Sequence, residues 1–227
     1  MQTVMEKDIA ACQAETQHEY VAPPQKPVYD VCKRIFDVVM CTFALIVLSP
    51  VFLAVAIAIK LEDGGKVFYS QTRLTKDCKE FKMYKFRSMC PDADKKLEEL
   101  LKYNEMEGPA FKMENDPRIT KVGKFIRKTS IDELPQLINI LRGEMSIIGP
   151  RPPLPREVEQ YTPYQLHRLD VITGLACYHE CQGRSEDKDF DKWVESDLKY
   201  IRERRMLTDL KVIFWTIRVV LTGKGAM

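Results

Sequence analysis

Two adjacent carboxylates, Asp132 and Glu133, stand in the stretch of the chain that is richest in chemically active side chains. Three cations precede the pair at short distance: Lys124, Arg127 and Lys128. Arg151 follows it within a proline-rich segment. Arginines neutralise a phosphate, and adjacent carboxylate oxygens are ligands for a divalent cation. The chemistry that this set favours is nucleophilic displacement at phosphorus, with an aspartyl phosphate-type intermediate.

A short helix that ends at Gly143 is predicted to position the acidic pair. Its apolar stripe has helical spacing: Leu134, Leu137, Ile138 and Leu141. Two registers compete for its start. In one, Ser130 and Glu133 form a capping box, which places Pro135 too deep in the helix. In the other, which we prefer, Asp132 is the N-cap and Pro135 lies in the first turn, where its missing N–H matters little. An N-cap is also the ordinary structural explanation for Asp132, whose loss would cost about 1 kcal/mol.

An uncharged run of 22 residues covers positions 38–59 of a chain that is otherwise 30% charged. About 20 apolar residues suffice for a helix to cross a bilayer. Pro50 in the middle of the run removes a helical hydrogen bond and predicts a bend, and Ser49 can satisfy part of the freed backbone. Cations are balanced in the two flanks, so they do not choose an orientation. Composition therefore supports equally a helix that breaks and returns and an ordinary spanning helix.

The composition excludes several classes of protein. The 227 residues are 45% hydrophobic, which is enough for one sizeable core. Lys and Arg number 35 against 33 Asp and Glu, so the net charge of +2 excludes a general nucleic-acid binder. Seven cysteines without a paired framework, and an N-terminus without an apolar signal segment, predict a reduced, cytosolic environment.

Local patterns predict the other elements. Residues 1–27 are polar and proline-rich and form a lead-in. The runs Val67–Gln71 and Phe81–Phe86 are predicted strands, and Asp92–Tyr103 is a predicted helix. Apolar residues at helical spacing over 206–221 predict a C-terminal amphipathic helix. This helix either lies in a membrane interface or closes the core.

Several runs stand in a fixed order along the chain: Gly108–Lys112, Asn115–Thr120, Arg127–Gln136, Ser146–Pro152 and Gly183–Arg184. Together they resemble the bacterial sugar transferases, the monotopic phosphoglycosyl transferases that start glycan assembly on polyprenyl phosphate. The resemblance extends over about residues 33–222. An ordered set of motifs is far more specific than any one of them.

The resemblance implies transfer of a sugar 1-phosphate from a UDP-sugar to undecaprenyl phosphate, with release of UMP and a requirement for Mg²⁺. This is the first membrane step of exopolysaccharide or other glycan assembly. It implies that Asp132 is the nucleophile that holds the phospho-sugar, and that Glu133 supports the metal and phosphate, so both are expected metal ligands. The implied phosphate- and nucleotide-binding residues are Lys85, Arg127, Pro150, Arg151 and Pro152.

The resemblance also implies an arrangement at the bacterial inner membrane. The family's membrane helix is re-entrant with a break at Ser-Pro, here Ser49–Pro50, which favours the returning topology. We expect a mostly helical α+β fold with a lead-in (1–27), a re-entrant membrane helix (28–60) and a single catalytic domain (61–227) on the cytoplasmic face, with interfacial amphipathic helices. Membrane lipids are expected partners and nucleic acids are not. Self-association into a homo-oligomer is compatible with the sequence, which carries no signal for or against it.

The chain departs from the family pattern in three places. Thr75 and Cys78 stand where many relatives have glycine. Thr173–Gly174 stands where Pro-Gly is common, and His179–Gln182 stands where Trp-Gln-Val-Ser is common. Two other classes of function are weighed against the enzyme: a catalytically silent membrane scaffold that recruits glycosyltransferases, and a sensor that binds nucleotide sugars. The intact acidic pair and arginines favour the enzyme. The motifs do not distinguish glucose, galactose and N-acetylated sugars.

Overall fold

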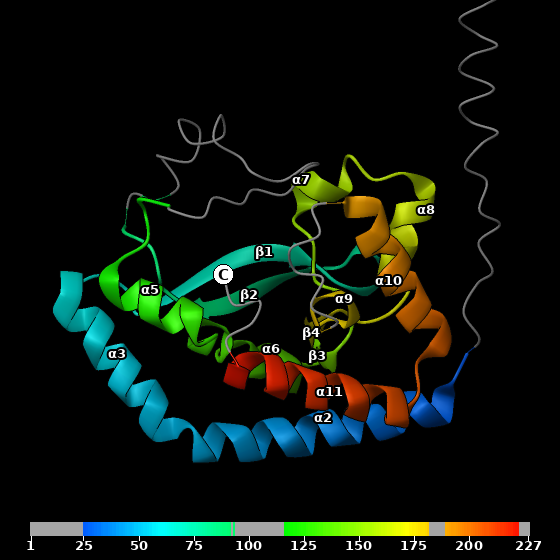
Figure 1. The fold of residues 1–227 in the computed structure, drawn as a ribbon, viewed down its shortest axis with the longest axis horizontal. Coiled ribbons are helices and arrows are strands. Elements are labelled where there is room, and N and C mark those ends of the chain that lie inside the picture. Colours follow the sequence, from blue (N-terminus) through cyan, green and yellow to red (C-terminus); the bar gives the residue numbers. More distant parts are fainter. Residues whose placement is uncertain (1–24, 92, 94–115, 182–188, 223–227) are drawn as a thin grey trace, which may run out of the picture.

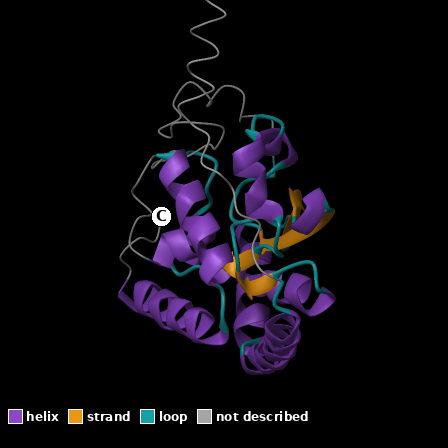
Figure 2. Ribbon diagram, turned by 90° about the vertical axis from the view of Figure 1, so that its right-hand side faces the viewer, coloured by secondary structure: helices purple, strands orange, loops and turns teal. Residues whose placement is uncertain are grey.

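The computed structural model describes residues 25–91, 93, 116–181 and 189–222. Within these ranges the chain is mostly helical with two small sheets, in agreement with the predicted α+β class. Two helices, α2 and α3, form a layer along one side, and the rest of the fold lies above it (Figure 1). Figure 2 shows the strands between this layer and further helices. The predicted helix over 92–103 and the first 24 residues of the lead-in lie outside the described residues.

Helices α2 (Pro27–Val47) and α3 (Ser49–Asp63) are bent by 59° relative to each other. The predicted break at Ser49–Pro50 is therefore confirmed, and the Ser49 hydroxyl donates to the carbonyl of Ile46 at 2.8 Å. In the described part of the chain, no single helix has the length and apolar character to cross a membrane, but this bent pair does when taken together. Large apolar side chains are exposed along the pair: Val31, Ile35, Val39, Phe43, Ile46, Leu53 and Ile57.

Strands β1 (Phe68–Leu74) and β2 (Glu80–Phe86) form an antiparallel hairpin, which confirms both predicted strands with shifted ends. The turn between them is unusual. Asp77 and Cys78 have φ of 56° and 57°, in the left-handed region that a glycine adopts without steric cost. The departure from the family's glycine pattern therefore falls at a turn whose backbone favours glycine.

The acidic pair lies on a 3₁₀ turn, η3 (Ile131–Glu133), between α5 (Lys121–Lys128) and α6 (Gln136–Arg142). The prediction that Asp132 is the N-cap of the helix is wrong, because α6 begins at Gln136 with Pro135 before it. The capping box of Ser130 is absent too, since Ser130 has φ of 54° and makes no side-chain cap bond. The turn and Pro135, which has no N–H, delay regular helical bonding until after the proline. The predicted end of the helix at Gly143 is confirmed, with φ of 79°.

The remaining elements surround a short parallel sheet of β3 (Ser146–Ile148) and β4 (Gly174–Ala176). They are η1 (Lys76–Cys78), α7 (Pro155–Val158), α8 (Pro163–Leu166), η4 (His167–Leu169), α9 (Tyr178–Cys181), α10 (Phe190–Glu203) and α11 (Met206–Thr222). The predicted C-terminal helix is thus confirmed as α11. It packs Val212 into the core with β3 and α10 and exposes a second apolar face: Leu207, Leu210, Phe214 and Ile217.

A buried carboxylate on α11 ties the start of α2 to the rest of the fold. Asp209, which is 2% exposed, accepts hydrogen bonds from Tyr29 and Tyr200, each at 2.8 Å. Lys33 forms an ion pair with it at 2.9 Å. Helices α2, α10 and α11 therefore meet at one charged centre whose polar groups are paired.

Asn139 joins α6 to the outer edge of β2. Its side chain is fully buried, accepts from the N–H of Tyr84 at 3.0 Å and donates to the carbonyl of Lys82 at 2.7 Å. Its amide also donates to Glu144 at 2.6 Å. The amide thus makes the two hydrogen bonds that a neighbouring strand would make with the backbone of β2. It thereby fixes the acidic turn against the strand that bears Lys85.

We expect Asn139→Leu to lower the free energy of unfolding by about 3 kcal/mol, because two backbone groups of β2 lose their partners at a covered edge. Thermal unfolding of the protein in detergent measures the change. Arg142→Leu is the matched control on the same helix, since it removes only an exposed contact with Tyr84 and should cost less than about 1 kcal/mol. Equal losses for the two variants would contradict this role of Asn139.

Candidate active site

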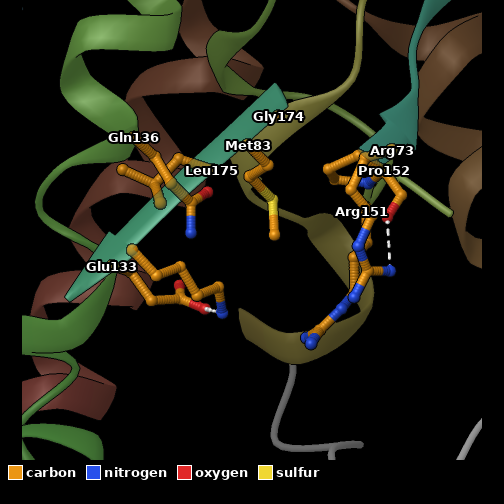
Figure 3. Close-up of a pocket in the computed structure, with 9 residues that line it drawn as sticks. Arg73, Met83, Glu133, Gln136, Arg151, Pro152, Gly174 and Leu175 are labelled. Carbon is orange, nitrogen blue, oxygen red and sulfur yellow. Dashed lines mark hydrogen bonds and ion pairs between the residues drawn. The ribbon is translucent and has the colours of Figure 1, made fainter. Parts of the chain in front are cut away.

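A small cleft, open to solvent, lies between the hairpin, the acidic turn and the loop after β3. Its lining residues are Arg73, Met83, Lys85, Glu133, Gln136, Arg151, Pro152, Gly174 and Leu175. Glu133 and Gln136 lie on one side and the two arginines on the other (Figure 3). Three of the lining side chains are cationic and one is a carboxylate, so the cleft suits an anionic ligand.

Glu133 pairs with Lys85 on the side of the cleft opposite the two arginines. The Lys85 Nζ lies 2.6 Å from Glu133 Oε1. Burial acts to raise the pKa of Glu133, but the charges of Lys85 and Arg151 outweigh it and hold the pKa below its usual range. Glu133 is therefore an anion at neutral pH. Its partner Lys85 lies on β2, where it is paired with Tyr69 of β1.

Asp132 has a different environment from its neighbour. It is 7% exposed and does not line the described cleft. Burial raises its pKa to about 6, against the opposing charges of Lys85 and Arg127. The carboxylate is ionised above this pH, in a poorly solvated position that favours its use as a nucleophile.

The structure brings four of the predicted site residues together in the cleft: Lys85, Glu133, Arg151 and Pro152. Arg127 lies in the last turn of α5, where its charge acts on Asp132 but where it does not line the cleft. Pro150 is buried beside the cleft, and its carbonyl accepts from the N–H of Gly174 at 2.8 Å. Ser49 and Pro50 do not line the cleft; they lie at the bend between α2 and α3.

Two polar residues of the cleft, Arg73 and Gln136, are not among the predicted site residues. Gln136 is the last residue of the Arg127–Gln136 motif. Strand alternation gives a signal for Arg73. Tyr69, Gln71 and Arg73 are alternate residues of β1, and Tyr69 is the partner of Lys85, so Arg73 and Lys85 lie on the same face of the hairpin. Gln136 follows Glu133 by three residues, the spacing of one helical turn.

Two of the departures from the family pattern meet next to the cleft. The N–H of Thr173 donates to the Thr75 hydroxyl at 3.3 Å, and the two hydroxyls lie 3.1 Å apart. A proline at position 173 has no N–H for this bond. Thr75 and Thr173 therefore form one buried contact, directly before Gly174 in the wall of the cleft.

The donor set fits a magnesium ion that is shared with a substrate. Within the described ranges, no three Asp, Glu, His or Cys side chains gather as a metal centre. Mg²⁺ is commonly held by one or two carboxylates together with water and substrate phosphates. Asp132 and Glu133 supply such oxygens, although one Glu133 oxygen already accepts from Lys85.

Comparisons with known proteins identify relatives over most of the chain. The model of the bacterial sugar transferase family matches residues 28–223. The galactosyl transferase CpsE of Streptococcus agalactiae serotype III (strain NEM316) is 43% identical over 196 residues, or 86% of this chain and 43% of the relative. The exopolysaccharide production protein ExoY of Sinorhizobium fredii (strain NBRC 101917 / NGR234) is 40% identical over 205 residues, or 88% of this chain and 90% of the relative.

A third relative is the UDP-glucose:undecaprenyl-phosphate glucose-1-phosphate transferase of Escherichia coli (strain K12). It is 39% identical over 219 residues, which cover 89% of this chain and 45% of the relative. The chain therefore spans less than half the length of two of these relatives and most of the length of the third.

We expect Asp132→Asn to stabilise the fold at neutral pH. The folded-state pKa of Asp132, about 6, exceeds the ordinary value of 3.8, so ionisation of Asp132 opposes folding. The loss of stability grows from pH 3.8 to pH 6 and is constant above that pH, at most about 3 kcal/mol. The melting temperature of the variant should exceed that of the original chain at pH 7.5, and the difference should shrink toward pH 4.

Glu133→Gln is the matched control for this effect, because the pKa of Glu133 is lowered and its charge favours folding. It should decrease the melting temperature at pH 7.5, since Lys85 loses its partner. An Asp132→Asn variant that melts below the original chain at pH 7.5 would contradict the assigned environment of Asp132.

Proposed function

The chain belongs to the bacterial sugar transferase family, and from this premise we propose that it transfers a sugar 1-phosphate from a UDP-sugar to undecaprenyl phosphate, releasing UMP. The product begins the membrane-bound assembly of an exopolysaccharide or another glycan. Relatives named as undecaprenyl-phosphate transferases of galactose and of glucose 1-phosphate support this activity. The ExoY relatives support a place in exopolysaccharide production.

The observation that carries the proposal is the charge arrangement around the acidic turn. A cleft lined by Arg73, Lys85 and Arg151 adjoins two carboxylates whose pKa values are shifted in opposite directions, upward for Asp132 and downward for Glu133. Three cations match a diphosphate, and Asp132 supplies a nucleophile that burial makes reactive. A silent scaffold needs neither the cleft nor the shifted carboxylate.

The reaction proceeds in two displacements at the sugar-bearing phosphorus. In the first, a carboxylate oxygen of Asp132 bonds to phosphorus and the bond to the UMP oxygen breaks, so UMP leaves with both bonding electrons. In the second, an oxygen of undecaprenyl phosphate bonds to the same phosphorus and the Asp132 carboxylate leaves. One site thereby serves a soluble donor and a lipid acceptor in turn.

The residues around Asp132 stabilise the charge that moves during these steps. Lys85 and Arg151 line the cleft, where their positive charges offset the negative charge of the phosphate oxygens. Arg127 favours the ionised form of Asp132. Glu133 holds Lys85 in place through the 2.6 Å ion pair. Mg²⁺, held by Asp132 and Glu133, would neutralise phosphate charge when bound.

The site works at the cytoplasmic face of the inner membrane, with α2 and α3 as a re-entrant anchor in contact with membrane lipids. The bent pair of helices and its row of exposed apolar side chains support this placement. Helix α11 adds an exposed apolar face beside the start of α2 (Figure 1) and serves as an interfacial helix. A helix that returns on its own side keeps the site at the depth of the lipid headgroups.

We expect purified protein in nanodiscs, with Mg²⁺ and undecaprenyl phosphate, to release UMP from one member of a panel of UDP-glucose, UDP-galactose and their N-acetylated forms. EDTA should stop the release and added Mg²⁺ should restore it. Asp132→Asn should abolish it, because the nucleophile is lost. Without acceptor, the original chain should gain the mass of one sugar phosphate, and the variant should not.

The matched control is Asp191→Asn, an exposed carboxylate in the first turn of α10, which should leave the rate unchanged. Release of UMP by Asp132→Asn at the original rate would exclude Asp132 as the nucleophile. Silence across the panel, with folded protein and lipid present, would favour the scaffold.

The returning topology predicts that both flanks of the membrane layer face the cytoplasm. Cysteines placed at the exposed positions Gln25 and Lys66 test this with an impermeant maleimide, against the labelling of the original chain. Both should react in inverted membrane vesicles and neither in intact spheroplasts. Reaction of one cysteine from each side would show a spanning helix instead.

A further inference from the structure

Arg73 is held in the wall of the cleft in a way that is unusual for a structural arginine. Its side chain is 15% exposed, its Nη1 donates to the carbonyl of Pro152 at 3.0 Å, and its Nε is buried without a hydrogen-bond partner among the described residues. The contact with Gln71 is long, at 3.4 Å. The guanidinium is thus largely removed from water but only partly satisfied by the protein.

The charge of Arg73 is also poorly compensated. Arg151 lies in the same wall of the cleft (Figure 3). The nearest carboxylate in an ion pair with Arg73 is Glu157, at 3.9 Å, and that carboxylate already accepts from the N–H of Leu154 at 2.8 Å. Burial and the neighbouring Arg151 lower the pKa of Arg73 to about 10. The desolvated guanidinium of Arg73, with the second cation Arg151 in the same wall, therefore makes a position that an anion would stabilise.

The opposite wall carries a polar group that faces the same space. Gln136 is 3% exposed and lines the cleft. Its side-chain amide points into the cleft across from the two arginines (Figure 3). An amide has both donor and acceptor atoms, so it suits a polar ligand that fills the cleft.

We propose that Arg73 is a direct ligand of a phosphate monoester, acting with Arg151 as a paired guanidinium site across the cleft from Glu133. The proposal rests on the proposed function, in which two such groups occur: the departing UMP and the phosphate of the lipid acceptor. The nucleotide is the preferred source. The bond to Pro152 fixes the plane of the Arg73 fork, so the remaining N–H groups can meet two phosphate oxygens together.

The test is the affinity of the full chain in detergent for UMP, for uridine and for farnesyl phosphate, measured by calorimetry. Arg73→Gln should weaken UMP binding about tenfold or more and leave uridine binding unchanged, because only the phosphate contact is lost. Arg73→Lys should restore part of the UMP affinity, since it keeps the charge but loses the fork. The exposed Arg156, just after the same proline segment, is the matched control, and Arg156→Gln should bind all three as the original chain does.

A loss for UMP alone supports the nucleotide as the source, and a loss for farnesyl phosphate alone supports the lipid acceptor. Unchanged affinity of a folded Arg73→Gln for both phosphates would overturn the proposal. An equal loss for uridine would overturn it too, because Arg73 would then only shape the cleft through Pro152. An original chain that binds neither phosphate would instead contradict the proposed function itself.

Discussion

The docking of α6 onto the edge of β2 is the constraint on which the site depends. The buried amide of Asn139 pairs with the backbone of Lys82 and Tyr84, and this sets the distance between the acidic turn and the hairpin. The ion pair of Lys85 with Glu133 needs that distance, since its two atoms lie only 2.6 Å apart. A buried polar residue that is fully paired specifies one arrangement of neighbouring elements more sharply than apolar packing does.

The two carboxylates show how adjacent residues acquire separate roles from their surroundings. Glu133 faces the cations of the cleft, and its pKa is lowered, whereas Asp132 is buried, and its pKa is raised to about 6. The first group is a permanent anion that holds Lys85. The second is poorly solvated, which is the state expected of a carboxylate that attacks phosphorus.

The layer of α2 and α3 is joined to the rest of the fold at both ends by charged groups. At its start, Lys33 pairs with the buried Asp209 at 2.9 Å, and Arg34 donates to the carbonyl groups that end α6. At its end, the Glu62 carboxylate accepts from the backbone N–H groups that open α5, where a helix dipole favours an anion. These contacts fix both ends of the α2–α3 layer to the elements that surround the cleft.

Features that depend on a few neighbouring residues could be predicted from the sequence. Pro50 predicted the bend in the apolar helix, β-prone runs predicted the two strands, Gly143 predicted the end of α6, and the acidic pair with its arginines indicated phosphate chemistry. The sequence did not determine the start of α6, because Pro135 and the 3₁₀ turn competed with the N-cap pattern of Asp132. Which of the site residues meet, and the presence of Arg73 and Gln136 among them, depend on tertiary packing, since Lys85 meets Glu133 across 48 residues and Arg73 meets Pro152 across 79. Burial and charge at such separations arise from packing, which local periodicity does not encode.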